Sequence, residues 1–567
     1  MTPTSRAPRA RTAALFTLLA FALALVSACG AATPPAQPST GSAQQPAADP
    51  AAPSEPAGEK TLTVASPLFI ANGWGPPDVT SFQDQRLSYH LYDSLTAIDL
   101  NAFAAGEPAE AVPSLASSWE VDESGKVYTF TIREGVTFST GRPVTAQAVK
   151  ASFERAKAVI ELIGQQARYP VLFKMQSIEA PDERTVVITL DEAFAPFLIT
   201  LAAPNYAIVD VEEAMAHAEG DDYGQAWLKA NSAGTGPYVL EEYIPEQRVV
   251  LRRNPNYWGG WDGVQPSVDR IIQLHVPEAA TRQLMITQGE VDIVHGLDAA
   301  QIAVLANDPN VSIVTNPVAM TINFLADLRA EPLRDVRVRQ ALRYAIDYEG
   351  MKTVVAGGFG EVMQTNILPG MPGHEAEMAS YYSFDPERAK ALLAEAGYPD
   401  GFEITLVSRD GSVGTVAYSK AVTFWQQNLA EIGVKANIVE MTSANMWGQI
   451  SEGTLNGIGI SGAGATVFDP DHPASVRAVQ ESALLGWDEV DPEAAARAAE
   501  LTAAGVSELD PARRAEIYAE ISRLMVERSP YWTFLQVVEP VVHRADVGGV
   551  VFSPSAQPID LKYVTKP

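Results

Sequence analysis

Three residues that could bind a metal ion lie close together in the last third of the chain: Asp469, Asp471 and His472. Carboxylate oxygens and an imidazole nitrogen at this spacing could contact one ion. Pro470 restricts the backbone between them, and the seven histidines form no cluster along the sequence. We therefore expect no metal site here and no other cofactor.

Catalytic motifs are missing from the sequence. It has no nucleophile elbow, no glycine-rich loop that would cradle a phosphate and no zinc-type pair of histidines. Adjacent acidic residues occur at Asp221-Asp222 and Glu241-Glu242, where a solvated surface is the simpler interpretation. The missing motifs therefore predict that the chain is no enzyme, with a secreted hydrolase as the alternative.

The first 28 residues have the features of an export signal. Arg6, Arg9 and Arg11 precede an apolar run over 13–28, which at about 16 residues is shorter than the roughly 20 of a membrane span. Cys29, the only cysteine, follows small residues as in a bacterial lipobox. We expect Cys29 to carry lipid after cleavage and to anchor the chain in the periplasm or on the outer face of the cell membrane. An intramolecular disulfide is excluded.

The mature chain begins with a linker and is strongly acidic. Residues 29–59 are rich in Ala, Pro and Ser without a periodic apolar pattern, which predicts a flexible tether. The formal net charge is −29, and without the three signal arginines 37 basic residues face 69 acidic ones, a net charge of −32. Such a surface repels nucleic acid and anionic lipid, so we expect neither as a partner.

From residue 60 onward, strand patterns alternate with helical patterns. Period-two alternation predicts strands at 60–66, 127–133, 185–190, 249–252, 403–407 and 434–439. Apolar residues at helical spacing predict helices at 146–156, 279–288, 336–346, 385–396, 419–432 and 512–528. Asp385-Pro386 and Asp510-Pro511 have the residue types of helix N-termini. This mixture over 567 residues predicts a mixed α/β fold with at least two lobes.

Several segments occur in an order that is typical of one protein family. They are 91–95 (LYDSL), 113–120 (PSLASSWE), 128–139 (YTFTIREGVTFS), 234–238 (GTGPY), 253–258 (RNPNYW), 289–293 (GEVDI), 334–342 (RDVRVRQAL) and 385–398 (DPERAKALLAEAGY). Together they resemble the family 5 extracellular solute-binding proteins, which serve ATP-driven importers for dipeptides, oligopeptides, nickel complexes and related solutes. The resemblance implies a monomer that delivers a small solute to an ABC permease with cytoplasmic ATPases. A sensor that presents its solute to a membrane receptor shares the fold and stays open as an alternative.

The resemblance also implies a large type II periplasmic-binding-protein fold, in which the ligand cleft lies between two hinged lobes. Lobe one would combine 60–100, 235–315 and 535–567, with an extra subdomain over 101–234. Lobe two would run over 316–534. The chain would cross between the lobes at 313–324 and 529–538, which would then form the hinge.

Ligand contacts in such a cleft come from distant parts of the chain. In lobe one and the subdomain the candidates are Trp74, Arg168, Tyr169, Asn205 and Tyr206. In lobe two they are Trp447, Thr466, Phe468, Asp469, Asp471 and His472. The aromatic rings would sandwich the solute, and Arg168 would pair with a carboxylate.

The segment 464–471 resembles the ligand loop of the family's second lobe. Peptide binders commonly place an Asp three residues before the Asp-Pro pair, and this chain has Thr466 there. A hydroxyl cannot replace a carboxylate beside a buried ammonium, so we expect an oligopeptide-like or other amino-acid-derived solute without an ordinary peptide ammonium. Nickel-complex binders have a histidine before this loop, where this chain has Ser461 and Gly462. A metal chelate or an oligosaccharide remains the alternative ligand.

Overall fold

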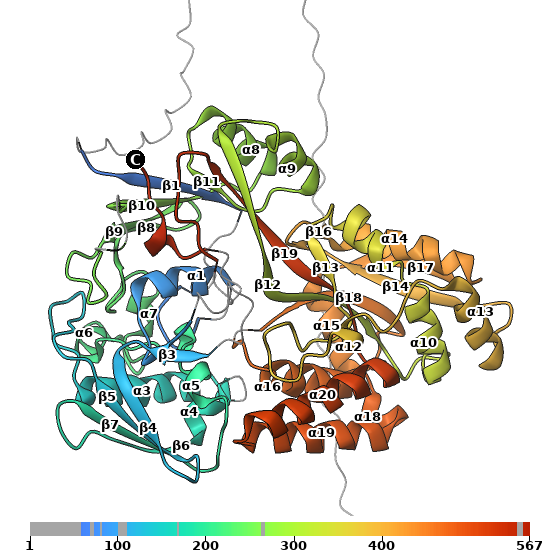
Figure 1. Ribbon diagram of the computed structural model, residues 1–567, viewed down its shortest axis with the longest axis horizontal. Helices are drawn as coiled ribbons and strands as arrows, with labels where there is room; N and C mark the ends of the chain where they lie inside the picture. The colour runs from blue at the N-terminus through green and yellow to red at the C-terminus, as the bar shows by residue number, and fades with distance from the viewer. Residues whose placement is uncertain are drawn as a thin grey trace, which may run out of the picture. The chain divides into compact units, whose positions relative to one another are not determined.

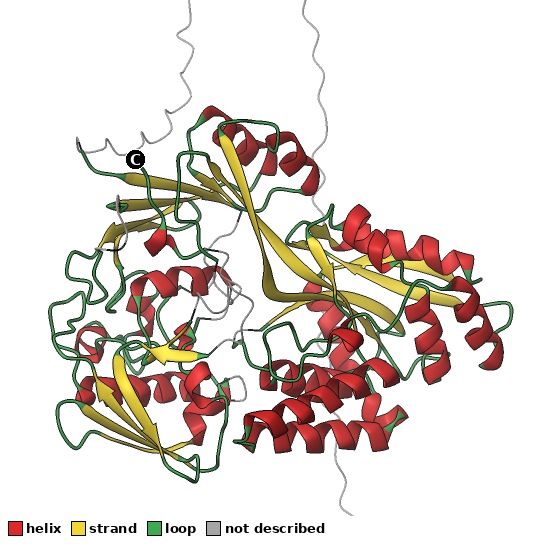
Figure 2. Cartoon of the chain, viewed as in Figure 1, coloured by secondary structure: helices red, strands yellow, loops and turns green. Residues whose placement is uncertain are grey.

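The computed structural model describes residues 58–67, 73–79, 82–99, 110–166, 169–261, 263, 267–465, 467–552 and 559–567. The predicted export signal, Cys29 and nearly all of the predicted tether lie outside these residues. Helices and strands alternate along the described chain (Figure 2). None of the described helices is long and apolar enough to cross a membrane.

A mixed sheet of eleven strands organises the described chain (Figure 1). Its order is β17-β14-β18-β12-β19-β11-β1-β10-β9-β8, and β13 also pairs with β19. The strands are β1 (Thr61–Ser66), β8 (Tyr238–Ile244), β9 (Arg248–Arg253), β10 (Arg270–His275), β11 (Ile293–Val294), β12 (Val311–Ala326), β13 (Gly360–Val362), β14 (Glu403–Arg409), β17 (Lys435–Met441), β18 (Gly457–Gly464) and β19 (Trp532–Arg544).

Two long strands, β12 and β19, join the two parts of this sheet. They pair antiparallel from Val311 opposite Arg544 to Phe324 opposite Trp532, with a register shift between Pro317 and Thr321. β18 of lobe two pairs with the second half of β12, and β11 of lobe one pairs with the end of β19. The predicted crossing at 313–324 lies on β12, and that at 529–538 lies on β19 from Trp532 onward, so the paired parts of both belong to one antiparallel ribbon.

The subdomain has a sheet of its own, in the order β4-β5-β7-β6. On β5, Tyr128, Phe130 and Ile132 are buried and alternate with more exposed residues, so one face of this sheet carries the core. Thr145 caps α3, which runs six residues past the predicted end because Val159 and Ile160 continue its buried face. The subdomain elements are β3 (Ala111–Pro113), β4 (Ala116–Val121), β5 (Val127–Ile132), α3 (Ala146–Leu162), α4 (Pro170–Lys174), β6 (Met175–Glu179), β7 (Thr185–Leu190), α5 (Phe197–Thr200), η2 (Pro204–Tyr206), α6 (Val211–Ala216) and α7 (Gln225–Leu228), and β3 pairs with β2 (Thr96–Ile98) of lobe one.

Lobe two is the more helical part of the chain. The carboxylate of Asp385 accepts from Arg388 N and that of Asp510 from Arg513 N, each at 2.8 Å, which confirms both predicted N-caps. Its further elements are α10 (Val336–Tyr344), α11 (Tyr348–Gly350), η3 (Met351–Val355), α12 (Ala376–Ala379), α13 (Pro386–Glu395), β15 (Ser412–Val413), β16 (Val416–Ala417), α14 (Tyr418–Glu431), α15 (Ser443–Glu452), α16 (Asp471–Pro473), η4 (Ala474–Glu481), α17 (Ser482–Leu484), α18 (Trp487–Val490), α19 (Pro492–Ser507) and α20 (Pro511–Arg528). Lobe one adds α1 (Phe82–Leu91), α8 (Ala279–Gln288), α9 (Ala299–Leu305) and η5 (Leu561–Tyr563).

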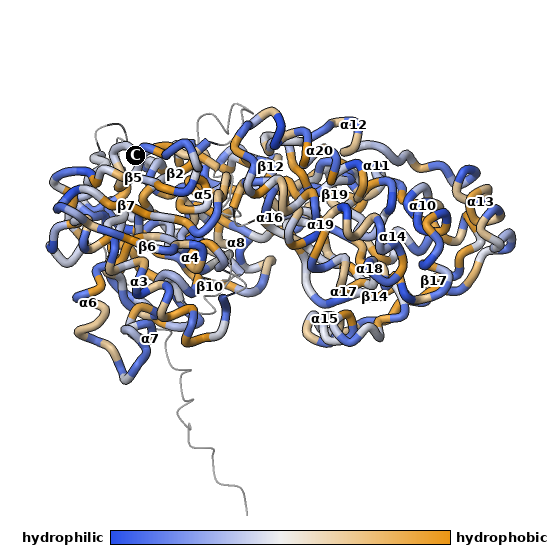
Figure 3. Tube along the Cα trace, turned by 90° about the horizontal axis from the view of Figure 1, so that it is seen from below, coloured by the Kyte–Doolittle hydropathy of each residue, from blue (hydrophilic) through white to orange (hydrophobic). Residues whose placement is uncertain are grey.

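Burial is divided among separate hydrophobic clusters. Phe324 stacks on Trp425 at 4.2 Å between ring centroids in the lobe-two core, and Tyr128 meets Phe197 at 4.5 Å in the subdomain core. Lobe one packs around the fully buried Trp74. Hydrophilic and hydrophobic residues alternate along most segments, as expected of elements with one buried face (Figure 3). Division into several cores is the usual solution for a chain of this size.

Candidate ligand-binding site

Parallel strands in both parts of the large sheet end at polar residues. In lobe one, β1 runs parallel to β10 and β11, and its partner β10 ends at His275. In lobe two, β14 runs parallel to β17 and β18 and ends at Arg409. Ligands of open α/β sheets bind outside the carboxyl ends of such strands. These two edges are therefore the places where a solute site is expected.

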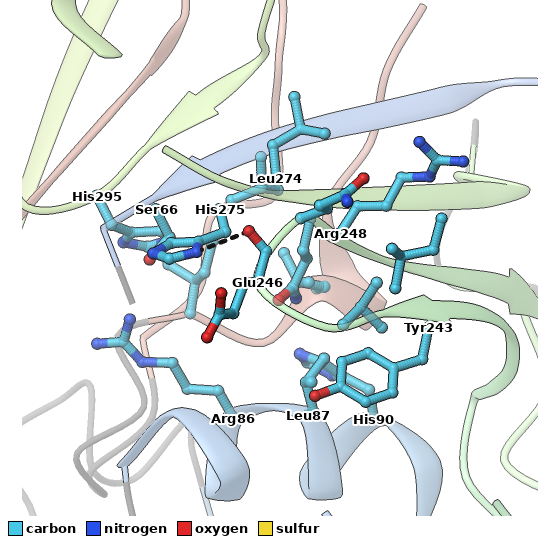
Figure 4. A pocket seen from close by; sticks show the side chains of 17 residues that line it. Ser66, Arg86, Leu87, His90, Tyr243, Glu246, Arg248, Leu274, His275 and His295 are labelled. Atoms are coloured by element: carbon cyan, nitrogen blue, oxygen red, sulfur yellow. Dashed lines mark hydrogen bonds between the residues drawn. The ribbon is translucent and has the colours of Figure 1, made fainter. Parts of the chain in front are cut away.

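A cavity of about 70 Å³ lies at the lobe-one edge, between the sheet and α1 (Figure 4). Arg86, Leu87 and His90 of α1 form one wall, and His275 and His295 lie on the opposite side. His275 Nδ1 is 3.0 Å from the backbone oxygen of Glu246, in the turn between β8 and β9. One water needs roughly 10–15 Å³, so the cavity has room for a small polar group.

Arg86 has a donor without a partner on the wall of this cavity. Its Nε is enclosed and has no hydrogen-bond partner among the described residues. Burial lowers the pKa of Arg86, and the carboxylate of Glu539 counteracts this through space. Burial, together with the charges of Arg86 and Arg282, lowers the pKa of His295 to about 3, so this imidazole is neutral. A guanidinium in such a place would gain from an anionic partner.

Glu539 lies on β19, where the chain passes between the lobes. Burial raises the pKa of Glu539, and the charge of Arg86 opposes that rise. Its Oε2 is 3.7 Å from the position that a Cβ would take on Gly414, in the turn between β15 and β16. The carboxylate of Glu539 therefore lies beside a turn of lobe two.

Arg409 occupies the lobe-two edge. Its Nη1 donates to Ser461 Oγ at 3.2 Å, and its guanidinium lies 4.8 Å from the centre of the Tyr418 ring. Tyr418 Oη in turn accepts from Gly462 N at 3.0 Å. The Nε of Arg409 is buried without a partner among the described residues. Arg409 is therefore held by Ser461 and Tyr418, and its Nε has no acceptor within the described part of the chain.

The segment after β18 is held in place by apolar packing and by an ion pair within lobe two. Phe468 packs in a small buried cluster that includes Met363 and Ile367. Both carboxylate oxygens of Asp469 accept from Arg514, at 2.6 and 2.8 Å, and Asp471 N donates to Asp469 Oδ1 at 2.8 Å. Burial and the charge of Asp469 raise the pKa of Asp471 to about 7.

The same segment and the end of α19 contact the subdomain. Val467 packs against the subdomain core, and Ala195 N donates to Val506 O at 2.8 Å. Leu509 lies against Gly125, where an added Cβ would come within 2.6 Å of Leu509 Cδ1. Lobe two and the subdomain therefore meet through direct protein contacts.

A larger cavity of about 570 Å³ lies between the subdomain and lobe one. Two of its carboxylates accept hydrogen bonds within the chain: Asp93 Oδ2 accepts from Thr235 Oγ1 and Trp258 Nε1, each at 2.8 Å, and Asp560 Oδ1 accepts from Lys562 N at 3.0 Å. These contacts hold Asp93 and Asp560 in place within the chain.

Comparison with known proteins supports a site of this kind. The family model "Bacterial extracellular solute-binding proteins, family 5 Middle" matches residues 110–477, more than half of the chain. The chain belongs to this family. The predicted family and the predicted mixed α/β, two-lobe fold are thereby confirmed, and the chain acts outside the cytoplasm as a solute-binding protein.

Relatives of this family 5 protein span almost its whole folded length. It is 27% identical over 487 residues to the probable D,D-dipeptide-binding periplasmic protein DdpA of Escherichia coli, covering 84% of this chain and 88% of that one. It is 28% identical over 493 residues to the glutathione-binding protein GsiB of Salmonella paratyphi A, covering 84% and 90%. The structure of HbpA2 from Haemophilus parasuis matches with a TM-score of 0.74 at 26% identity, covering 89% of this chain and 100% of that one.

Several predicted contact residues of this family 5 protein lie in its core. Trp74 is fully buried and donates from Nε1 to Asn231 O at 2.8 Å, with its ring against Tyr243 on the cavity wall. Asn205 Nδ2 donates to Pro77 O, Val79 O and Tyr169 Oη, which ties the segment 73–79 to the subdomain. Tyr206 is buried beside them. The structure therefore gives these residues a supporting position, and their contact with solute stays a prediction.

The remaining predicted residues are spread more widely. Trp447 packs against the lobe-two core, whereas Phe468, Asp469, Asp471 and His472 stay together after β18. Arg168 and Thr466 lie outside the described residues. Among the residues that the structure describes, no group of three or more His, Cys, Asp or Glu side chains could hold a metal ion.

Sequence reasoning missed Arg86, Arg409 and Glu539. None of them lies in a recognisable motif, and only the position of Arg409, two residues after a predicted strand, offered a signal. The fold also brings His90, His275 and His295 to one cavity, although they form no cluster along the chain.

Proposed function

We propose that this family 5 protein captures a small amino-acid-derived solute that carries a carboxylate and delivers it to the permease of an ABC importer. The observation that carries this proposal is Arg409, a guanidinium at the carboxyl end of a parallel strand with a buried Nε and no partner for it among the described residues. A carboxylate satisfies a guanidinium through charge-assisted hydrogen bonds. The names of two relatives refer to a D,D-dipeptide and to glutathione, both amino-acid derivatives.

Capture would proceed by closure of the two lobes around the ribbon of β12 and β19. A solute held by Arg409 on one side and by lobe one on the other makes its full set of contacts only in the closed state. Binding then shifts the population toward closure by the free energy of those added contacts. The hydrogen bond from Ala195 N to Val506 O is one protein contact that supports such a state.

The proposal also includes attachment of the protein to the membrane and its state as a monomer. Cys29, placed after a signal of small residues, would carry lipid and tether a monomer to the outside of the membrane. Two or more acyl chains on one residue give stable anchoring, whereas one chain is marginal.

The experiment is to identify the compound that copurifies with the protein by mass spectrometry, remove it and measure its rebinding by calorimetry. We expect a carboxylate-bearing amino-acid derivative that is bound without turnover and that reduces the radius of gyration in small-angle scattering. Uptake of that compound into vesicles that contain the partner permease would distinguish transport from sensing. Chemical conversion of the compound, or an uncharged sugar in its place, would contradict the proposal.

A further inference from the structure

The guanidinium of Arg409, on which the proposed function rests, is fixed by contacts on its face and on its edge. It lies 4.8 Å from the centre of the Tyr418 ring, within the range of a cation–π contact. At its edge, Nη1 donates to Ser461 Oγ at 3.2 Å. A contact on the face and a contact on the edge together fix both the position and the plane of a guanidinium.

The Tyr418 ring is itself held firmly. Tyr418 is 1% exposed, and its Oη accepts from Gly462 N at 3.0 Å. A Cβ on Gly462 would lie 2.8 Å from this Oη and 2.4 Å from Val413 Cγ2. Only glycine therefore leaves the hydroxyl enough room to reach the backbone amide of residue 462.

Three separate elements bring these residues together. Arg409 ends β14, and β18 runs parallel to β14, which places Ser461 beside Arg409. The short hairpin of β15 and β16 reverses the chain after Arg409, and Tyr418 begins α14 directly after it. Arg409 is thus part of a rigid frame of strand, hairpin and helix within lobe two.

We propose that Tyr418 is a positioning residue that makes this site selective for a carboxylate, because its ring fixes the guanidinium of Arg409 before the solute binds. A side chain that is already fixed loses little conformational freedom on binding. A planar carboxylate accepts charge-assisted hydrogen bonds on two oxygens, whereas a carboxamide is neutral and has only one acceptor oxygen. This inference rests on the proposed capture of a carboxylate by Arg409 and adds the residue that sets its selectivity.

The test measures how strongly the protein prefers a carboxylate over the matching carboxamide. The probes are L-amino acids and N-acetyl-L-amino acids, each beside its carboxamide. The readout is the concentration of each probe that raises the melting temperature of the full-length protein, freed of copurifying compounds. We expect the wild type to prefer the carboxylates. Tyr418→Leu should reduce this preference about tenfold, because the guanidinium loses its fixed plane before binding.

Two further variants keep the residue 418 ring in place. Tyr418→Phe loses only the hydrogen bond to Gly462 N, so its preference for carboxylates should fall less than that of Tyr418→Leu. Gly462→Ala places a Cβ against Tyr418 Oη and should also reduce the preference. These two variants decide the outcome if Tyr418→Leu does not fold.

A second buried Arg–Tyr contact of lobe two provides a matched control. The guanidinium of Arg343 lies 4.3 Å from the centre of the Tyr382 ring, and Tyr382 is 3% exposed. Tyr382→Leu should lower the melting temperature without any probe and leave the preference for carboxylates unchanged. A purely structural role of Tyr418 would give this same result.

The outcomes separate this inference from the proposed function. Equal losses of affinity for carboxylates and carboxamides in the Tyr418 variants would overturn the inference. A preference that is lost in Arg409→Met and kept in the Tyr418 variants would overturn it too, while leaving capture by Arg409 intact. A wild type without the preference would also overturn it, and the copurifying compound would still decide whether a solute is captured.

Discussion

Asp469 and Arg514 form a buried, two-fold hydrogen-bonded ion pair, with Arg514 Nη1 at 2.8 Å from Oδ2 and Nη2 at 2.6 Å from Oδ1. The pair connects the segment after β18 to helix α20, and both residues are nearly excluded from solvent. It therefore fixes the base of the segment that contacts the subdomain and that the family resemblance assigns to the ligand.

Asp469→Ala leaves Arg514 buried without its counter-charge. We expect the free energy of unfolding to fall by about 3–5 kcal/mol, measured by urea denaturation. Arg497→Met, which breaks an exposed ion pair with Glu520, should cost less than about 1 kcal/mol. A loss for Asp469→Ala as small as that of the control would show that the pair does not hold this segment.

Arg409→Met should weaken binding of the copurifying compound by about 2–5 kcal/mol, because a carboxylate in the cleft loses its counter-charge. The sequence predicts a loss of the same size for Arg168→Ala. Calorimetry on both variants identifies which guanidinium holds the carboxylate. If neither change moves the dissociation constant tenfold, a carboxylate is not the recognised group.

Asp471 should make the stability of the protein depend on pH. The pKa of Asp471 is about 7 in the folded chain, and that of an unfolded Asp is about 3.9. The folded state thus binds more protons between these values, so the free energy of unfolding falls as pH rises through this window. Asp471→Asn removes this contribution.

The measurement for Asp471 compares urea unfolding at about pH 5 and about pH 8. Relative to the wild type, Asp471→Asn should gain on the order of 1–2 kcal/mol at the higher pH. This is less than the full shift would imply, because the side chain is partly exposed and Arg514, Lys174 and Tyr518 favour its charged form. An equal difference at both values would rule out Asp471 as the titrating group.

Leu509→Ser removes an apolar contact between lobe two and Gly125 of the subdomain. The closed state should lose about 0.5–1 kcal/mol, since roughly half of this side chain is buried. More copurifying compound should then be needed to reach the compact form in small-angle scattering. Val439→Ser, at a similarly exposed residue on β17, serves as the control. Identical titrations of Leu509→Ser and the wild type would show that this contact does not contribute to closure.

Cys29→Ala should release the protein from the membrane into the soluble fraction, because the lipid has no other cysteine to occupy. Fractionation without detergent followed by immunoblotting measures this. Retention of the variant in the membrane fraction would contradict lipid anchoring at Cys29.

Helix caps and strand limits of this chain could be predicted from the sequence because they depend on residues that are close in the sequence. Asp385 and Asp510 cap helices through bonds to residues three positions away, and the period-two pattern of 185–190 became β7 with the predicted limits. The ordered family motifs also allowed the fold class to be predicted, because each motif forms a local turn or strand whose residues are close in the sequence.

The partners of the charged residues were decided only by the tertiary structure. Asp469 meets Arg514 because α20 packs beneath the segment after β18, and no spacing rule links residues 45 positions apart. His90, His275 and His295 line one cavity although they come from separate segments, because α1 packs against the sheet beside β10 and β11. Helix and strand propensities depend on residues that are close in the sequence. Burial and charge pairing depend on how distant elements pack, and the sequence by itself did not specify that packing.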